Sequence, residues 1–159
     1  METLFNNFSS IIVFLHVISA VIWVGGMIAI RLAVHYSMQE IDDPKIKLGR
    51  TLESLRRFFN MVIPSIVILL ATAIVMIIAL GFKGTSLYSF VIAKEVIWTI
   101  MTIIFIIIFI KRNQAQKAFD EGALPIAKEK LLPIANYLIP INIVLGLIAI
   151  YLGVTLRGF

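Results

Sequence analysis

Residues 58–82 read FFNMVIPSIVILLATAIVMIIALGF, an uninterrupted run without a charged side chain. A helix rises 1.5 Å per residue, so about 20 apolar residues cross the hydrocarbon core of a bilayer, and this run is long enough. A membrane β-barrel would instead show segments of about 10 residues with alternating hydrophobicity. The run therefore predicts a membrane-spanning α-helix.

Three other stretches are similarly long and apolar. Together they predict four spans, at about residues 8–31, 58–81, 88–110 and 131–155. The first is not expected to be a signal peptide, because no basic residue precedes it and its apolar run is too long. We expect an all-α, integral membrane four-helix bundle in which residues 1–159 form a single transmembrane domain.

The composition agrees with this class of protein. Hydrophobic residues make up 60% of the chain and charged residues 14%, against about 45–50% and 25% in soluble domains. The mean hydropathy is +1.02. The chain has no cysteine, which excludes disulfides, thiolate metal sites and iron–sulfur clusters within it. No Walker loop and no GxGxxG, HExxH or GxSxG motif is present.

The basic residues predict the orientation. Six Lys and Arg residues lie between residues 31 and 57, and five between residues 111 and 130. The short link after the second span holds only Lys83, and the tail holds only Arg157. By the positive-inside rule, we expect a multi-pass protein of the bacterial cytoplasmic (inner) membrane with both N- and C-termini in the periplasm.

Both basic links are expected to be partly helical. Asp42-Asp43-Pro44 is a helix start signal. Apolar residues then recur on one face of a helix and continue toward the second span, at Leu48, Leu52, Leu55 and Phe59. The pattern predicts a helix that projects into the cytoplasm before it enters the membrane.

Four polar residues are predicted to share one level in the outer half of the membrane. At 1.5 Å per residue, His16 and Thr72 lie about 12 Å deep, and Lys94 and Glu95 about 9–10 Å deep. Such groups are costly in hydrocarbon and often mark function. Lys94 and Glu95 are therefore candidate catalytic groups that would handle protons. The alternative is that both side chains extend back to the membrane surface.

The two histidines are expected to differ in role. His16 is a candidate metal or haem ligand, and the alternative is a hydrogen bond that holds two helices together. His35 lies about 28 Å farther along the same helix, so one haem cannot take both. His35 and Arg31 are interpreted as an anchor at the cytoplasmic interface, or as contacts for a substrate or a haem propionate.

Two helical stripes connect these residues with aromatic and sulfur-containing side chains: His16, Ser19, Trp23 and Met27, and Lys94, Trp98, Met101 and Phe105. Cu(I) accepts Met and His ligands. The candidate copper ligands are therefore His16, Met27, Met76 and Met101. Ordinary apolar packing is the alternative for each methionine. Small residues are expected to let helices approach within the bundle, at Gly25, Gly26, Ala29, Ala33, Gly146 and Gly153.

Residues 15–26, LHVISAVIWVGG, resemble the first-helix pattern of the copper resistance protein D (CopD) family. Arg57-Phe58, Lys94 and Lys111-Arg112-Asn113 fit the same family at the later spans. The resemblance implies a CopD-like inner-membrane protein that takes up or otherwise handles copper, through a site in the outer half of the bundle.

A second similarity is to HemJ, the membrane protoporphyrinogen oxidase family. It is carried by His16, Trp23, Arg31-Leu32, His35 and Lys94. It implies a haem b-binding oxidoreductase acting on a porphyrinogen or quinone, in which His16 is an axial ligand and Trp23 packs near the macrocycle.

Three functions therefore remain open: copper handling, haem b chemistry, and a cofactor-free accessory membrane subunit. The cofactor is copper or haem b. The expected partners are the lipid bilayer and a second copy of the chain or a larger membrane complex, but no nucleic acid.

Overall fold

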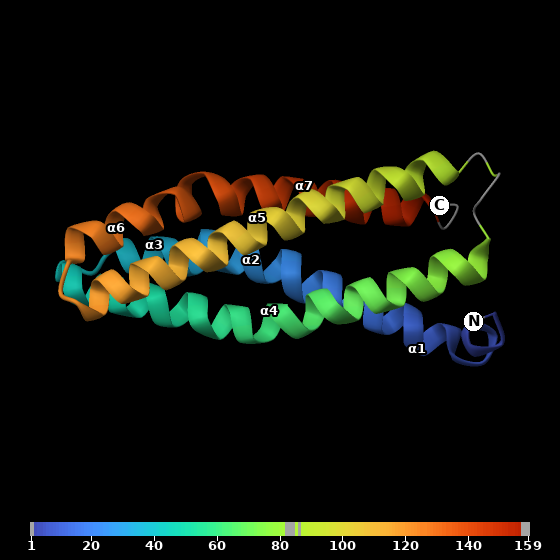
Figure 1. The fold of residues 1–159 in the computed structure, drawn as a ribbon, viewed down its shortest axis with the longest axis horizontal. Helices are drawn as coiled ribbons and strands as arrows, with labels where there is room; N and C mark the ends of the chain where they lie inside the picture. Colours follow the sequence, from blue (N-terminus) through green and yellow to red (C-terminus); the bar gives the residue numbers. More distant parts are fainter. Residues whose placement is uncertain (1, 82–84, 86, 157–159) are drawn as a thin grey trace.

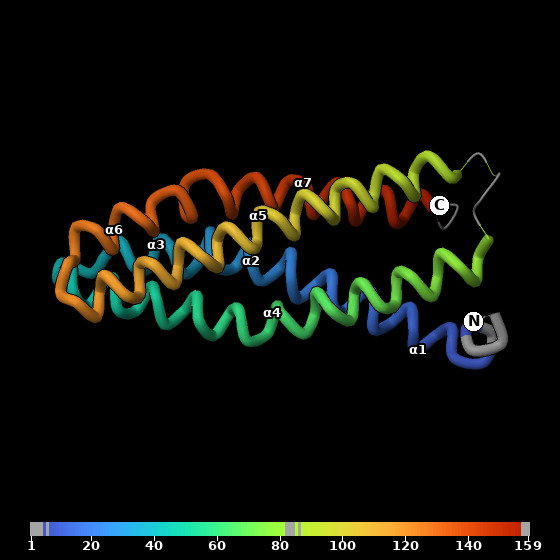
Figure 2. Tube along the Cα trace, viewed as in Figure 1, coloured from blue at the N-terminus to red at the C-terminus, as the bar shows by residue number. Residues whose placement is uncertain are grey.

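The computed structural model describes residues 2–81, 85 and 87–156, without the side chains of residues 2–4 and 6. Four long helical segments run up and down the length of an elongated bundle (Figure 1; Figure 2 traces the same path). The described part of the chain contains no β-strand. The all-α four-helix bundle predicted from the sequence is confirmed.

Each segment is long and apolar enough to cross a membrane: Asn7–Gln39, Pro44–Leu80, Tyr88–Asp120 and Leu124–Thr155. All four extend past the predicted spans at the end of the bundle that holds residues 40–43 and 121–123. We call this the basic end, because both Lys- and Arg-rich links lie there. The predicted helical extensions of the spans are thus present.

The first segment consists of α1 (Glu2–Ala20), η1 (Val21–Gly25), α2 (Gly26–Ala29), η2 (Ile30–Val34) and α3 (His35–Gln39). The two η elements are π-helical turns, which often occur at functional sites in membrane and soluble helices alike. Trp23 lies in η1 and Arg31 in η2. Ser19, Trp23 and Met27, which the sequence places on one helical stripe, are buried, so this face is directed into the bundle.

The second segment is the single helix α4 (Pro44–Leu80). The Asp43 carboxylate caps it by accepting hydrogen bonds from the backbone N–H groups of Lys45 (2.8 Å) and Ile46 (2.9 Å). The predicted stripe is confirmed along its first turns, which bury Leu48, Leu52, Leu55 and Phe59. The helix ends at Gly81, whose φ of +58° is left-handed.

The other half of the bundle contains α5 (Tyr88–Asp120), α6 (Leu124–Pro133), η3 (Ile134–Leu138) and α7 (Ile139–Thr155). Gly122, at a φ of +77°, makes the turn between α5 and α6. Lys83 and Arg157, on which part of the orientation argument rests, lie outside the described residues.

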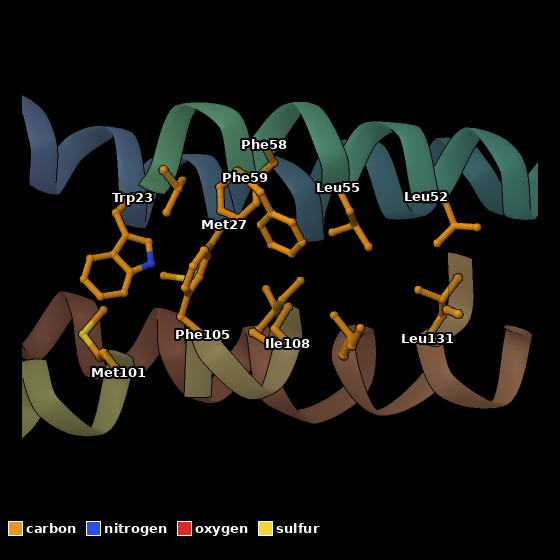
Figure 3. Packing of buried hydrophobic residues seen from close by; sticks show 14 of the residues in the cluster. Trp23, Met27, Leu52, Leu55, Phe58, Phe59, Met101, Phe105, Ile108 and Leu131 are labelled. Carbon is orange, nitrogen blue, oxygen red and sulfur yellow. The ribbon is translucent and has the colours of Figure 1, made fainter. Parts of the chain in front are cut away.

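The apolar core is concentrated between Trp23 and the basic end. Figure 3 shows Trp23, Met27 and Phe59 facing Met101 and Phe105 across the bundle. Trp23 and Phe105 meet edge to face, with ring centroids 6.2 Å apart. Fewer side chains are buried toward the chain termini, where Figure 1 shows the α1–α4 pair and the α5–α7 pair separating. His16 and Lys94 lie on that side of the core.

The small residues of the first segment do not all pack inside the bundle, so that prediction was partly wrong. Gly25, Ala29 and Ala33 are exposed, and a Cβ on Gly25 would meet nothing within 4 Å. Two other glycines do allow close approach. A Cβ on Gly26 would lie 2.7 Å from the Phe58 ring, and one on Gly146 would lie 2.6 Å from Val24. Gly25 lies two residues from the buried Trp23, about 200° around the helix, so its stripe is directed away from the core.

Arg112 is a buried cation that joins α5 to α4. It is 8% exposed, and its Nη2 donates to the carbonyl oxygen of Leu52 (3.1 Å) and to Oε1 of Gln116 (2.9 Å). The helical extensions are therefore held together by polar contacts as well as by leucines.

We expect Arg112→Met to lower the free energy of unfolding by about 1–3 kcal/mol, because it removes charge-assisted hydrogen bonds and leaves the Leu52 carbonyl without this donor. The measurement is reversible unfolding in mixed micelles. Arg50→Met, at an exposed position on α4, is the control. Equal stability of the two variants would contradict a bridging role for Arg112.

Candidate functional site

His16 and Thr72 join α1 to α4 on the side of the core away from the basic end. His16 Nδ1 lies 3.0 Å from Thr72 Oγ1. The two residues are 56 positions apart in the chain, and the depth argument placed them at the same level. The prediction that His16 and Thr72 lie at one level is therefore confirmed. Thr72 is buried, whereas His16 is half-buried.

The Thr72 hydroxyl determines which ring nitrogen of His16 carries the proton. Its single hydrogen is directed to the backbone carbonyls of Ile68 (2.7 Å) and Leu69 (3.1 Å). The hydroxyl oxygen must therefore accept from His16, so Nδ1 carries the hydrogen. In a neutral ring this leaves a lone pair on Nε2. A histidine that ligates a metal is commonly oriented in the same way, by a hydrogen bond from its other nitrogen.

Lys94 is directed into the bundle, against α7. A Cβ on Gly153 would lie 2.9 Å from Lys94 Nζ, so the ammonium occupies space that any larger residue at position 153 would fill. Within the described part of the chain, its ammonium has no hydrogen-bond acceptor and no ion-pair partner.

Two indole N–H groups near Lys94 are also without an acceptor. Trp23 Nε1 and Trp98 Nε1 are both buried and make no hydrogen bond within the described residues. Trp98 follows Lys94 by one helical turn on α5, and Trp23 belongs to the facing first segment. Buried polar groups are rarely left unpaired, so these donors indicate a missing acceptor.

Asn142, for which the sequence suggests a hydrogen bond across helices, is not among the candidate site residues. It is fully buried in α7, and its Nδ2 donates to the Met101 carbonyl oxygen (3.3 Å), while Oδ1 has no partner among the described residues. A lone Asn in an apolar run carries no signal that distinguishes this role from ordinary helix packing.

The three candidate methionine ligands do not gather around His16. Met27 and Met101 are buried in the apolar core, and Met27 lies about 16 Å along the first segment from His16. Met76 is half-buried, one turn from Thr72 on α4, and is the methionine nearest in level to His16. No group of three His, Cys, Asp or Glu residues comes together in the described part of the chain.

The remaining candidates are divided between two places. Glu95 is exposed although Lys94, its neighbour, is directed inward. Arg31 and His35 line a cavity at the basic end. The structure thus joins His16 to Thr72 and places Lys94 beside Gly153, whereas Arg31 and His35 lie at the basic end.

The fold and these residues define a multi-pass, all-α membrane protein with a polar cluster within its spans. Comparison of the chain with family models, curated proteins and solved structures returns no significant match.

Proposed function

We propose that this chain is a haem b-binding membrane protein and that His16 is the axial ligand it supplies. The observation that carries the proposal is the hydrogen bond from His16 Nδ1 to Thr72, which leaves Nε2 available as a ligand. The similarity of the His16, Trp23 and Lys94 positions to the HemJ family points in the same direction.

The small number of metal-binding side chains near His16 favours haem, a tetrapyrrole, over a free metal ion. A porphyrin provides four nitrogens, so one histidine is enough to hold its metal. A free metal ion needs several protein ligands at one point. His16 stands alone among the His, Cys, Asp and Glu residues described around it.

The donors around His16 also fit such a group. Trp23 Nε1 and Trp98 Nε1 have no acceptor within the described residues, and neither has Lys94 Nζ, which lies against α7. A carboxylate or carbonyl oxygen of a bound ligand would satisfy them. The sparser core on this side of Trp23 is consistent with room for a ligand.

When bound, haem supplies one-electron chemistry, whose potential the axial ligand and its surroundings tune. The residues of the chain have three tasks. Thr72 holds the His16 ring in one tautomer and orientation. Lys94 offers a cation or a second nitrogen ligand, and Trp23 closes the site toward the core. We propose that the redox partner is a lipid-soluble substrate such as a quinone or porphyrinogen.

We further propose that the protein lies in a bacterial cytoplasmic membrane with its basic end in the cytoplasm and its termini in the periplasm. This is supported by the grouping of both Lys- and Arg-rich links at one end of the bundle.

Copper handling of the CopD-like kind is the second candidate. It is favoured by Met76, which lies on α4 one turn from Thr72, the hydrogen-bond partner of His16. His16 and Met76 would form a two-coordinate site for Cu(I), a soft ion. The unpaired Lys94 ammonium nearby opposes a cation, and this ranks copper below haem.

The test is a visible spectrum of the protein purified in mild detergent, oxidised and then reduced with dithionite, with metal analysis of the same sample. We expect a Soret band, sharp α and β bands on reduction, and about one iron per chain. A sample reconstituted with haem b guards against loss during purification. A colourless sample that carries copper would support the second candidate. A sample that takes up neither would leave the accessory-subunit interpretation.

A further inference from the structure

A cavity of about 280 Å³ lies at the basic end, between the end of the first segment, the start of α4 and the α6–η3 region. Its apolar floor includes Leu48, Leu55 and Ile134. Its rim carries three cations, Arg31, Lys47 and Lys128, with His35 beside them and Asp42 as the single carboxylate.

Arg31 is the residue that makes this cavity a binding site. Its Nη1 is buried and has no hydrogen-bond partner among the described residues. The guanidinium carbon lies 5.5 Å from the centre of the Tyr36 ring, a cation–π contact that fixes the position of the charge. An oriented guanidinium with an unused N–H group is suited to a phosphate or carboxylate.

Two other arginines at this end, Arg56 and Arg57, share one carboxylate. Glu53 accepts hydrogen bonds from Arg56 Nε (2.7 Å), Arg56 Nη2 (2.8 Å) and Arg57 Nε (2.8 Å). These bonds lower the pKa of the Glu53 carboxyl to about 2, so it stays ionised across the physiological range. Arg56 and Arg57 also do not line the cavity. Arg31, by contrast, lines the cavity and makes no ion pair with a carboxylate among the described residues.

We propose that this cavity binds the phosphate group of an anionic amphiphile, with Arg31, Lys47 and Lys128 around the phosphate and the apolar floor against its carbon chain. Basic pockets at the cytoplasmic ends of membrane helices bind anionic lipid headgroups in this way. The leaflet lipid and a soluble phosphate compound share this chemistry. The cavity lies about 28 Å from His16 along the first segment, so the proposal does not depend on haem.

The experiment compares the wild-type protein with Arg31→Gln, Lys128→Gln and Arg57→Gln. Arg57→Gln is the matched control, because it removes one exposed cation from the same end but outside the cavity. Each protein is placed in nanodiscs of phosphatidylcholine containing one-fifth phosphatidylglycerol, and lipid retained after release is counted by native mass spectrometry. The thermal midpoint in detergent is measured with and without inorganic phosphate.

We expect the wild-type and Arg57→Gln proteins to retain phosphatidylglycerol, and Arg31→Gln and Lys128→Gln to retain at least about fivefold less, the loss expected for a charge-assisted hydrogen bond worth about 1 kcal/mol. Stabilisation by inorganic phosphate that Arg31→Gln abolishes would instead identify a soluble phosphate compound as the source. Equal retention by all four proteins, with no effect of phosphate, would overturn the proposal. Equal loss in Arg57→Gln and Arg31→Gln would also overturn it, because the attraction would then be general surface charge. Lys128 is exposed, so its variant tests the cavity even if Arg31→Gln misfolds.

Discussion

His16→Ala is expected to lower the haem b content of the purified protein at least tenfold, a loss of about 1.4 kcal/mol or more of binding free energy. The reason is that the hydrogen bond from Nδ1 to Thr72 leaves Nε2 of His16 available as a ligand. The measurement is a titration of the detergent-purified protein with haem b, followed at the Soret band.

His35→Ala is the matched control, because His35 is the other histidine of the chain and lies at the basic end. It should retain nearly all of the haem. A His16→Gly protein whose Soret band returns on addition of imidazole would show that the ring acts as a ligand rather than as a brace between helices. Equal loss of haem in His16→Ala and His35→Ala would contradict a single site at His16.

Thr72→Val separates the ligand from the group that orients it. The substitution removes the acceptor for His16 Nδ1 but leaves Nε2 in place. We expect haem affinity to fall about 10–100-fold, the loss typical when the partner of a metal ligand is removed. The Soret band should be retained. An unchanged affinity and spectrum would show that the Thr72 contact does not set the state of the His16 ring.

Much of the fold could be predicted from the sequence, because the bilayer imposes length and polarity on each span. The stripe through Leu48, Leu52 and Leu55 predicted the extension of α4, and Asp43 predicted its start. The exposure of Gly25 follows from the same periodicity, because residues two positions apart in a helix are separated by about 200°, which places Gly25 opposite the buried Trp23. The π-helical turns themselves could not be predicted, because they leave no simple pattern in the sequence.

The sequence predicted how deep in the membrane the candidate site residues lie, but not which of their side chains face the bundle. Counting residues along two antiparallel helices placed His16 opposite Thr72, and the two are hydrogen-bonded. The same counting gave Lys94 and Glu95 equal weight, whereas only Lys94 is directed inward. The stripe of Lys94, Trp98, Met101 and Phe105 agrees with the inward direction of Lys94, since Met101 and Phe105 are buried. The space beside Gly153 that the ammonium occupies belongs to another helix and could not be read from α5.

Lys94→Met is expected to change two properties in opposite directions. Met has a similar length and no charge, so the apo-protein should gain about 1–3 kcal/mol in unfolding free energy when the unpaired ammonium is removed from an apolar bundle. Haem affinity should fall about tenfold, because a cation or ligand facing the site is lost. The first effect is measured by reversible unfolding of the apo-protein, and the second by the Soret titration. Lys117→Met, at a side chain that is 80% exposed, is the control and should change neither.

The opposite signs distinguish a functional lysine from a structural one. A lysine that only extended to the membrane surface would give little change in either measurement. A lysine that stabilised the bundle would make both fall together. Gly153→Ala tests the same arrangement with Lys94 retained, since the added methyl group would lie 2.9 Å from Nζ and displace the ammonium. It should lower haem affinity as Lys94→Met does, whereas Gly25→Ala, whose new methyl group meets nothing within 4 Å, should leave it unchanged. Equal effects of the two glycine substitutions would show that Lys94 does not act from its place beside Gly153.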